Sequence, residues 1–120
     1  MTDTHPEIHL PLPPSAFHIL LALADGEKHG YAIMQEVAVL TGGDLKLGPG
    51  TLYGAIKRLL ADGWIAESDK RPAPELDDER RRYYRLTDLG GRVVRAEAAR
   101  LSRLVDAARS KRLVTKPRLS

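Results

Sequence analysis

Four side chains in one short segment have the chemistry needed to bind a polyanion. They follow the run Gly48-Pro49-Gly50, and they are Thr51, Tyr53, Lys57 and Arg58. The glycines and the proline predict that a helix begins at about Thr51, where free amides and the positive end of the helix dipole favour a phosphate group. A helix that enters the major groove of DNA needs such a compact start, because its first residues must reach base edges and phosphates. These four residues are therefore the first candidates for contact with DNA.

The same segment has a second interpretation, in which it binds nothing. Its apolar residues recur at i, i+4, i+7 and i+8, which predicts an amphipathic helix ending at Asp62-Gly63. These apolar residues are Leu52, Ile56, Leu59 and Leu60. Lys57 and Arg58 lie on the remaining, outward arc, and we expect Tyr53 to be exposed. The sequence leaves open whether the two charges only keep the surface soluble and whether Tyr53 is a packing residue instead.

A second cluster of basic side chains surrounds a long loop. Residues 64–66 and 83–86 are typical of two short strands, and the polar loop between them is too long for a tight hairpin turn. The basic residues at its two roots are Lys70, Arg71, Arg80, Arg81 and Arg82, and the acidic residues at its tip are Glu75, Asp77, Asp78 and Glu79. Such a wing can lie on a phosphate backbone or reach into the minor groove. A solvated loop whose charges neutralise one another is the alternative that stays open.

Catalytic and metal-binding patterns are missing from the sequence. The four histidines are scattered along the first 29 residues, and cysteine is absent, so neither a zinc site nor a disulfide is expected. No phosphate-binding glycine loop, dinucleotide-binding fingerprint or nucleophile elbow occurs. We therefore expect no enzyme activity, no catalytic residue, no cofactor and no metal, and we assign His29 to the turn before the second helix.

The remaining elements follow from apolar spacing, caps and turns. Three further helices are expected: one capped by Ser15 and ending near residue 25, one over about 31–40, and one that begins after a cap at Thr87 and persists to about Leu113. Residues 1–14 contain four prolines and are expected to form an arm or a loose strand, and residues 45–47 a brief extended piece. Three helices and a long-looped hairpin occur in the order of a winged helix-turn-helix. We therefore expect a mainly α fold with a small β-hairpin wing and a C-terminal helix.

The last helix carries an apolar seam along one side. Its members are spaced 4, 3, 4 and 3 residues apart, and they are Val94, Ala98, Leu101, Val105 and Ala108. A seam of this length cannot be buried within so small a domain, so a helix from a second copy of the chain is expected to cover it.

Composition limits the size and the class of the protein. The 120 residues suffice for one compact domain with an appendage, and 42% hydrophobic and 29% charged residues are ordinary for a globular chain. The net charge is only +3, but basic residues greatly outnumber acidic ones between residues 80 and 112, as a face that binds a polyanion requires. No run is long enough to span a membrane, and we expect a cytoplasmic protein.

Four ordered motifs carry a resemblance to one family of regulators. They are His29-Gly30-Tyr31, the run from Gly48 to Tyr53, the run Leu60-Ala61-Asp62-Gly63-Trp64-Ile65, and the run from Arg82 to Thr87 that leads to Gly90. Together they resemble the PadR family of transcriptional regulators over about residues 15–112. Any one of these motifs would be weak, whereas four in order at the right separations are a specific match.

This resemblance implies a homodimer that binds double-stranded DNA through the helix at 51–62. It implies that Tyr31 contacts the DNA backbone and that four residues of the helix face the groove, namely Thr51, Tyr53, Lys57 and Arg58. It also implies that the wing uses Arg80, Arg81 and Arg82. We accordingly divide the chain into a proline-rich arm (1–14), a winged-helix DNA-binding domain (15–87), a dimerisation helix (88–113) and a flexible tail (114–120).

Family behaviour also suggests how such a protein is controlled. Members are mostly repressors that a small molecule or another signal releases, so an unidentified small-molecule effector is an expected partner. Some relatives hold flat aromatic ligands between aromatic side chains at the dimer seam. We do not expect that mode here, because residues 88–112 contain no aromatic side chain.

Two other kinds of function remain as alternatives. The first is a winged-helix module that binds a protein and leaves its basic face unused. The second is RNA binding, which is the weaker of the two because the chain lacks the stacked surface aromatics that single-stranded recognition employs.

Overall fold

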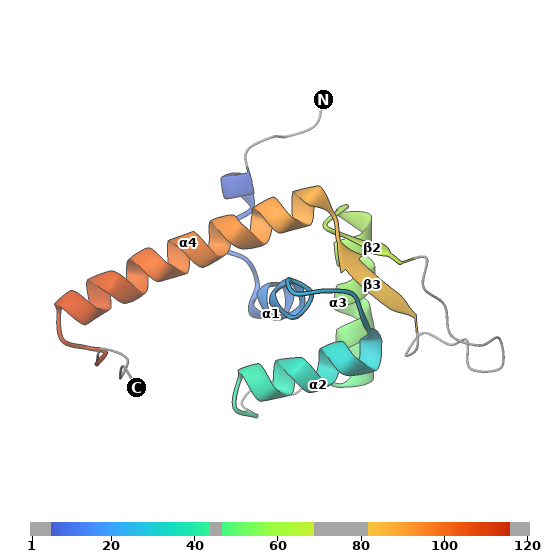
Figure 1. The fold of residues 1–120 in the computed structure, drawn as a ribbon, viewed down its shortest axis with the longest axis horizontal. Coiled ribbons are helices and arrows are strands. Elements are labelled where there is room, and N and C mark those ends of the chain that lie inside the picture. The colour runs from blue at the N-terminus through green and yellow to red at the C-terminus, as the bar shows by residue number, and fades with distance from the viewer. Residues whose placement is uncertain (1–5, 44–46, 69–81, 116–120) are drawn as a thin grey trace.

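The computed structural model describes residues 6–43, 47–68 and 82–115 of the chain. Its elements occur in the order η1 (Pro6–His9), α1 (Pro14–Ala22), β1 (Lys28–His29), α2 (Gly30–Leu40), α3 (Pro49–Ala61), β2 (Ile65–Glu67), β3 (Tyr83–Leu86) and α4 (Asp88–Ser110) (Figure 1). The predicted fold class is confirmed: the described residues form a mainly helical domain with a small antiparallel sheet. The predicted extended piece at 45–47 lies largely outside the described residues.

The core lies where α1, α2 and α3 meet beside the sheet. Each helix turns apolar residues inward, and in α2 and α3 the buried residues recur mostly three or four positions apart, as the helical repeat requires. The apolar residues that are fully or almost fully buried include Ile19, Leu20, Ile33, Val37, Leu52, Ile56 and Leu59. Burial of these side chains leaves the opposite arc of α3 facing solvent.

The sheet has three strands in the order β1-β3-β2, and both pairings are antiparallel. Ile65 lies opposite Leu86 and Glu67 opposite Tyr84, which confirms the predicted hairpin and shifts its first strand by one residue. Strand β1 was not predicted. It consists only of Lys28 and His29, opposite Tyr84 and Tyr83, and two polar residues carry no strand pattern of their own.

Of the two predicted helix caps, at Thr87 and Ser15, the one at Thr87 is confirmed, and the structure adds a cap at His29 that was not predicted. His29 caps α2, where its Nδ1 accepts a hydrogen bond from the amide of Ala32 at 3.0 Å, and Thr87 caps α4, where its Oγ1 accepts from the amide of Gly90 at 3.0 Å. The cap predicted at Ser15 is wrong. Helix α1 begins one residue earlier at Pro14, which suits the first position of a helix, and no side chain caps it.

Two glycines allow elements to approach closely. A Cβ built on Gly90 would lie 1.8 Å from the carbonyl oxygen of Trp64, so only glycine lets α4 begin against the start of β2. A Cβ built on Gly30 would lie 2.4 Å from the hydroxyl of Tyr53, so the start of α2 rests against the ring of a residue on α3. Both contacts join elements that are distant in sequence.

The N-terminal segment is folded against the rest of the protein. Residues 6–9 form the 3-10 helix η1, which packs on α4, and the ring of His9 meets that of Trp64 edge-on with centroids 5.2 Å apart (Figure 1). The prediction of an arm or a loose strand is therefore wrong for this segment. Residues 1–5 lie outside the described residues.

A buried carboxylate holds this segment to α4. Glu97 is 2% exposed, and it accepts a hydrogen bond from the backbone amide of Leu12 at 2.9 Å and another from Arg100 at 3.0 Å. The side-chain hydrogen bonds from Arg100 lower the pKa of the Glu97 carboxyl, which outweighs the raising effect of burial. Burying this charge is tolerable only because both partners are present.

Candidate nucleic-acid interface

Helix α3 presents one polar face to solvent. The residues on it that are exposed recur at helical spacing, and they are Gly50, Thr51, Gly54, Lys57, Arg58 and Ala61. The helix begins at Pro49 after Gly48, whose extended backbone starts the first turn without a side-chain cap. The exposed face thus combines small residues, a hydroxyl and two cations, and the predicted positions of Thr51, Lys57 and Arg58 on the outward arc are confirmed.

The expectation of an exposed Tyr53 is wrong. Its side chain is 9% exposed, and its ring and hydroxyl lie against Gly30 at the start of α2. The residue belongs to the hydrophobic core cluster. The alternative in which Tyr53 packs inside the protein is the correct one, because position 53 lies beside the apolar stripe of α3 and α2 covers it.

Tyr31 is the second aromatic candidate, and it comes from another helix. It is the second residue of α2 and is 49% exposed. Its neighbour Gly30 touches Tyr53 on α3, so the first turn of α2 and the first half of α3 lie together. The structure therefore places the start of α2, which carries the exposed ring of Tyr31, beside α3.

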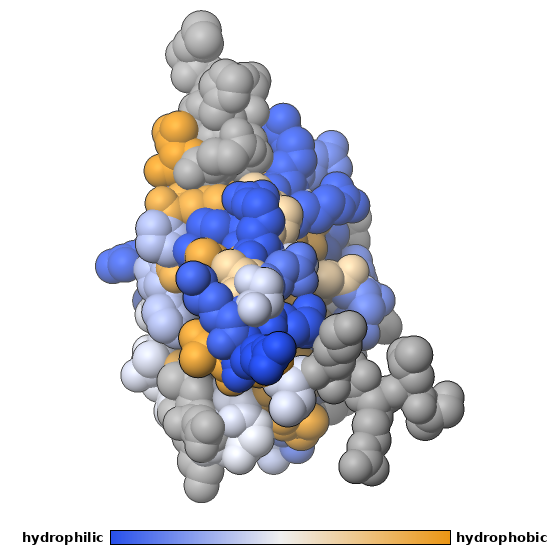
Figure 2. Space-filling model, turned by 90° about the vertical axis from the view of Figure 1, so that its left-hand side faces the viewer, coloured by the Kyte–Doolittle hydropathy of each residue, from blue (hydrophilic) through white to orange (hydrophobic). Residues whose placement is uncertain are grey.

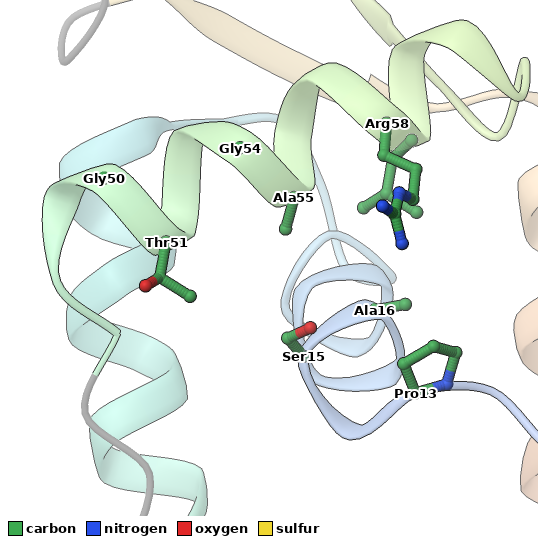
Figure 3. Close-up of a pocket in the computed structure, with 9 residues that line it drawn as sticks. Pro13, Ser15, Ala16, Gly50, Thr51, Gly54, Ala55 and Arg58 are labelled. Atoms are coloured by element: carbon green, nitrogen blue, oxygen red, sulfur yellow. The ribbon is translucent and has the colours of Figure 1, made fainter.

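Thr51 and Arg58 point toward α1, as Figure 3 shows, and they line a groove between α1 and α3. Lys57 does not line this groove. Consecutive side chains on a helix diverge by about 100°, so the side chains of Lys57 and Arg58 point in different directions. The sequence does not reveal this difference, because it does not show where α1 lies.

The wing is described only at its roots. Arg82 is half-buried immediately before β3. The other predicted wing residues, Lys70, Arg80 and Arg81, lie outside the described residues. Their contact with DNA stays a prediction.

The predicted seam on α4 divides into a buried and an exposed part. Val94 is 6% exposed and belongs to the core cluster of the chain itself, so its prediction as an open dimer contact is wrong. Ala98 and Val105 are exposed, and Leu101 and Ala108 are half-buried. Because Val94 lies in the first half of α4, the globular domain already covers it.

The second half of α4 extends past the domain (Figure 1). Leu104, which the heptad pattern missed, is 54% exposed, and its neighbour Val105 is 41% exposed. A signal for Leu104 exists in the sequence, since it follows Leu101 by three residues on the same side of the helix. Viewed from this end of the molecule, Figure 2 shows hydrophobic residues interspersed among hydrophilic ones on the surface.

The described residues hold no metal-binding cluster and no membrane-spanning helix. Within the ranges that the structure describes, no three histidine or acidic side chains gather where they could hold a metal ion. In those ranges no helix has the length and apolar character needed to cross a bilayer.

A protein-family model identifies the chain. The model of the transcriptional regulator PadR-like family matches residues 19–96, a range that contains α2, α3, the sheet and the first part of α4. The chain belongs to the PadR-like family. This membership confirms the resemblance drawn from the sequence motifs, and it places the protein among transcriptional regulators rather than enzymes.

Two curated relatives are similar in sequence. One is an uncharacterized 37.1 kDa protein in transposon TN4556 of Streptomyces fradiae, 41% identical over 86 residues that make up 72% of this chain. The other is the transcriptional regulator Rv3488 of Mycobacterium tuberculosis, 38% identical over 73 residues that make up 61% of this chain. The aligned residues span 22% of the first relative's length and 62% of the second's.

Solved structures share the fold of this PadR-like chain. A PadR-like transcriptional regulator from Bacillus cereus superposes with a TM-score of 0.66 at 17% identity, over 83% of this chain and 92% of that one. A PadR family transcription regulator from Clostridium difficile superposes with a TM-score of 0.65 at 22% identity, over 82% and 97%. At these identities the likeness concerns the fold alone.

Proposed function

We propose that this PadR-like protein is a sequence-specific DNA-binding transcriptional regulator that acts as a homodimer and represses transcription. The observation that carries the proposal is the solvent-exposed face of α3, which includes Thr51, Gly54, Lys57 and Arg58. The other side of this helix packs into the core of the domain. A helix with small residues, a hydroxyl donor and cations on its outer side suits insertion into the major groove.

Neighbouring elements supply further contacts in this proposal. Lys57 reaches a guanine edge or a phosphate, and Tyr31 contacts the backbone from the start of α2. Lys70, Arg80, Arg81 and Arg82 place positive charge along the phosphates or in the minor groove. Tyr53 takes no direct part, because its hydroxyl is buried.

A second copy of the chain completes the unit that binds DNA. The exposed Leu104 and Val105, with Leu101 and Ala108 beside them, form an apolar strip beyond the globular domain, and a partner helix would remove it from water. A twofold dimer sets two α3 helices about 34 Å apart, one helical turn of DNA, which suits an inverted-repeat operator. Occupation of a promoter by this dimer would block transcription.

The proposal also includes release of the protein from DNA by a small-molecule effector. A small molecule that binds one arrangement of the two winged helices better than another would change the angle between the two α3 helices and weaken binding. The absence of aromatic residues from 88–112 argues against a flat ligand sandwiched between α4 side chains.

The experiment that tests the proposed function is fluorescence anisotropy with the DNA upstream of the protein's own gene and a shuffled duplex, across a salt series. Tight binding to the upstream duplex alone, with an affinity that falls steeply with salt, is expected. Equal weak binding to both duplexes, or no binding to either, would contradict specific recognition of that DNA and would favour the protein-interaction module. Candidate effectors added to the complex test release, which fails if no ligand changes the affinity.

The first prediction concerns dimerisation. Leu104→Asp is expected to weaken self-association at least about a hundredfold, because a carboxylate would have to be buried without a partner in each half of the interface. Sedimentation velocity over a range of protein concentrations measures the shift from dimer to monomer. Ser102→Asp, two residues away on the opposite side of α4, introduces the same charge at an exposed position and should leave the dimer intact. A dimer equally stable in both variants would contradict an interface through the α4 strip.

The second prediction concerns Gly54. A Cβ at this exposed position would meet nothing within 4 Å, so no contact in the chain requires glycine inside this helix. Gly54→Ala should therefore raise stability by about 0.5–1 kcal/mol in thermal unfolding. Gly54→Leu should keep the protein folded but lower its affinity for DNA at least about tenfold, since the larger side chain would hold α3 away from the duplex. Unchanged DNA affinity of Gly54→Leu would show that this face does not approach DNA closely.

A further inference from the structure

A groove runs between the beginning of α1 and the exposed side of α3 (Figure 3). Its volume is about 330 Å³, and the polar side chains that line it are those of Ser15, Thr51 and Arg58. Among the described residues no acidic side chain lines it, and the remaining lining residues are small or apolar. The groove is therefore positive overall, and it is open to a ligand from the same side as the polar face of α3.

Arg58 is placed to hold an anion in this groove. Figure 3 shows its guanidinium reaching from α3 toward Ala16 on α1, while the hydroxyls of Thr51 and Ser15 lie farther along the same groove. In the described part of the chain, Arg58 forms no ion pair with a carboxylate. An arginine with no carboxylate partner, facing the helix that carries the hydroxyl of Ser15, suits an oxyanion, because the planar guanidinium can donate two parallel hydrogen bonds to it.

We propose that this groove binds one phosphate of the DNA backbone, with Arg58 as the counter-ion and Ser15 as a hydrogen-bond donor. The inference rests on the proposed DNA-binding function and deepens it. It assigns Arg58 to a phosphate instead of a base, and it adds Ser15, a residue of α1 that the sequence motifs did not single out. Lys57, whose side chain lies outside the groove, is then the cation of α3 that is left for the bases.

A phosphate contact by Arg58 would add affinity for DNA without adding sequence specificity. A phosphate contact fixes the register and orientation of a protein on DNA but carries no sequence information. A phosphate held between α1 and α3 would clamp the recognition helix to the duplex from one side. Loss of the clamp should therefore weaken binding to every sequence by the same factor.

The test measures the salt dependence of DNA affinity for the full chain, with the upstream and the shuffled duplex. Arg58→Gln should lower affinity for both duplexes by the same factor, about threefold to tenfold, and leave their ratio unchanged. The slope of log affinity against log salt should become shallower by about 0.9 for each phosphate that is no longer neutralised, or about 1.8 for a dimer. Ser15→Ala should have a smaller effect of the same kind, and little further effect when combined with Arg58→Gln, because both residues serve one phosphate.

Arg103→Gln provides the matched control. It removes the same charge from an exposed position on the second half of α4, away from the groove, and should change neither slope nor affinity. An unchanged slope in Arg58→Gln, or a loss confined to the upstream duplex, would overturn the phosphate assignment while leaving DNA binding itself established. If the wild-type chain binds neither duplex at any salt concentration, the proposed function fails and the clamp fails with it.

A second arm separates DNA phosphate from a free anion. Inorganic phosphate is titrated at constant ionic strength while the backbone amides of Ser15 and Thr51 are followed by NMR. Saturable shifts that disappear in Arg58→Gln, combined with an unchanged DNA salt slope in that variant, would identify a site for free phosphate and overturn the proposal. Absence of saturable shifts, together with a reduced DNA slope, is the expected result.

Discussion

Gly90→Ala is expected to destabilise the protein by about 3 kcal/mol or more, a large part of the stability of a domain of this size. The new methyl group would lie 1.8 Å from the carbonyl oxygen of Trp64 and 2.7 Å from its carbonyl carbon. Both are backbone atoms, so no side chain can turn aside. The same carbonyl oxygen accepts a hydrogen bond from the amide of Thr87 at 3.1 Å, and separating α4 from β2 would break it.

Gly91→Ala is the control for this prediction. It makes the same change one residue later in the same helical turn, where a Cβ would meet nothing within 4 Å. We expect it to be neutral or to stabilise the protein by up to about 1 kcal/mol, because alanine loses less backbone entropy on helix formation. Thermal and urea unfolding followed by circular dichroism measure both variants. Equal unfolding midpoints for Gly90→Ala and the wild type would refute the close approach of α4 to Trp64.

Lys57→Glu is expected to reduce the affinity for the upstream DNA at least about thirtyfold, while the protein stays folded. The side chain is exposed on α3, so its loss removes no packing inside the domain. In a dimer the change removes two cations from the interface and places two carboxylates against phosphates and base edges, so that repulsion replaces attraction. Fluorescence anisotropy at one fixed salt concentration measures the loss.

Lys111→Glu makes the same change of charge at an exposed position after the end of α4. Figure 1 shows the end of α4 on the opposite side of the molecule from β2 and β3, so only a small change in DNA affinity is expected. If both charge reversals weaken binding alike, the attraction is a property of net charge and not of the α3 face. If neither does, and Leu104→Asp alone abolishes the biological effect, the protein-interaction module is the better account.

Local patterns in the sequence were sufficient for most of the elements. The apolar spacing of Leu52, Ile56 and Leu59 predicts both the existence of α3 and the arc that it buries, because a helix exposes its remaining residues at the same period. Thr87 indicates the beginning of α4, since a cap acts on amides only three residues away. The family motifs rest on the same short segments.

Other features depend on contacts between segments that are far apart in the chain. Burial of Tyr53 requires α2 to lie across α3, and burial of Val94 requires the start of α4 to lie on the domain. The two-residue strand β1 exists only because Tyr83 and Tyr84 offer it a partner. Periodicity along one segment contains no information about which neighbour will cover it.

The sequence by itself therefore determined the family, the order of helices and strands, and the outward positions of Thr51, Lys57 and Arg58. Only the tertiary structure decided that Arg58 and Thr51 point toward α1 while Lys57 does not, and that residues 6–12 pack against α4 through Glu97. The physical reason is the range of the interactions. Helix periods and caps act within a few residues, whereas a groove or a buried ion pair exists only after distant elements have packed together.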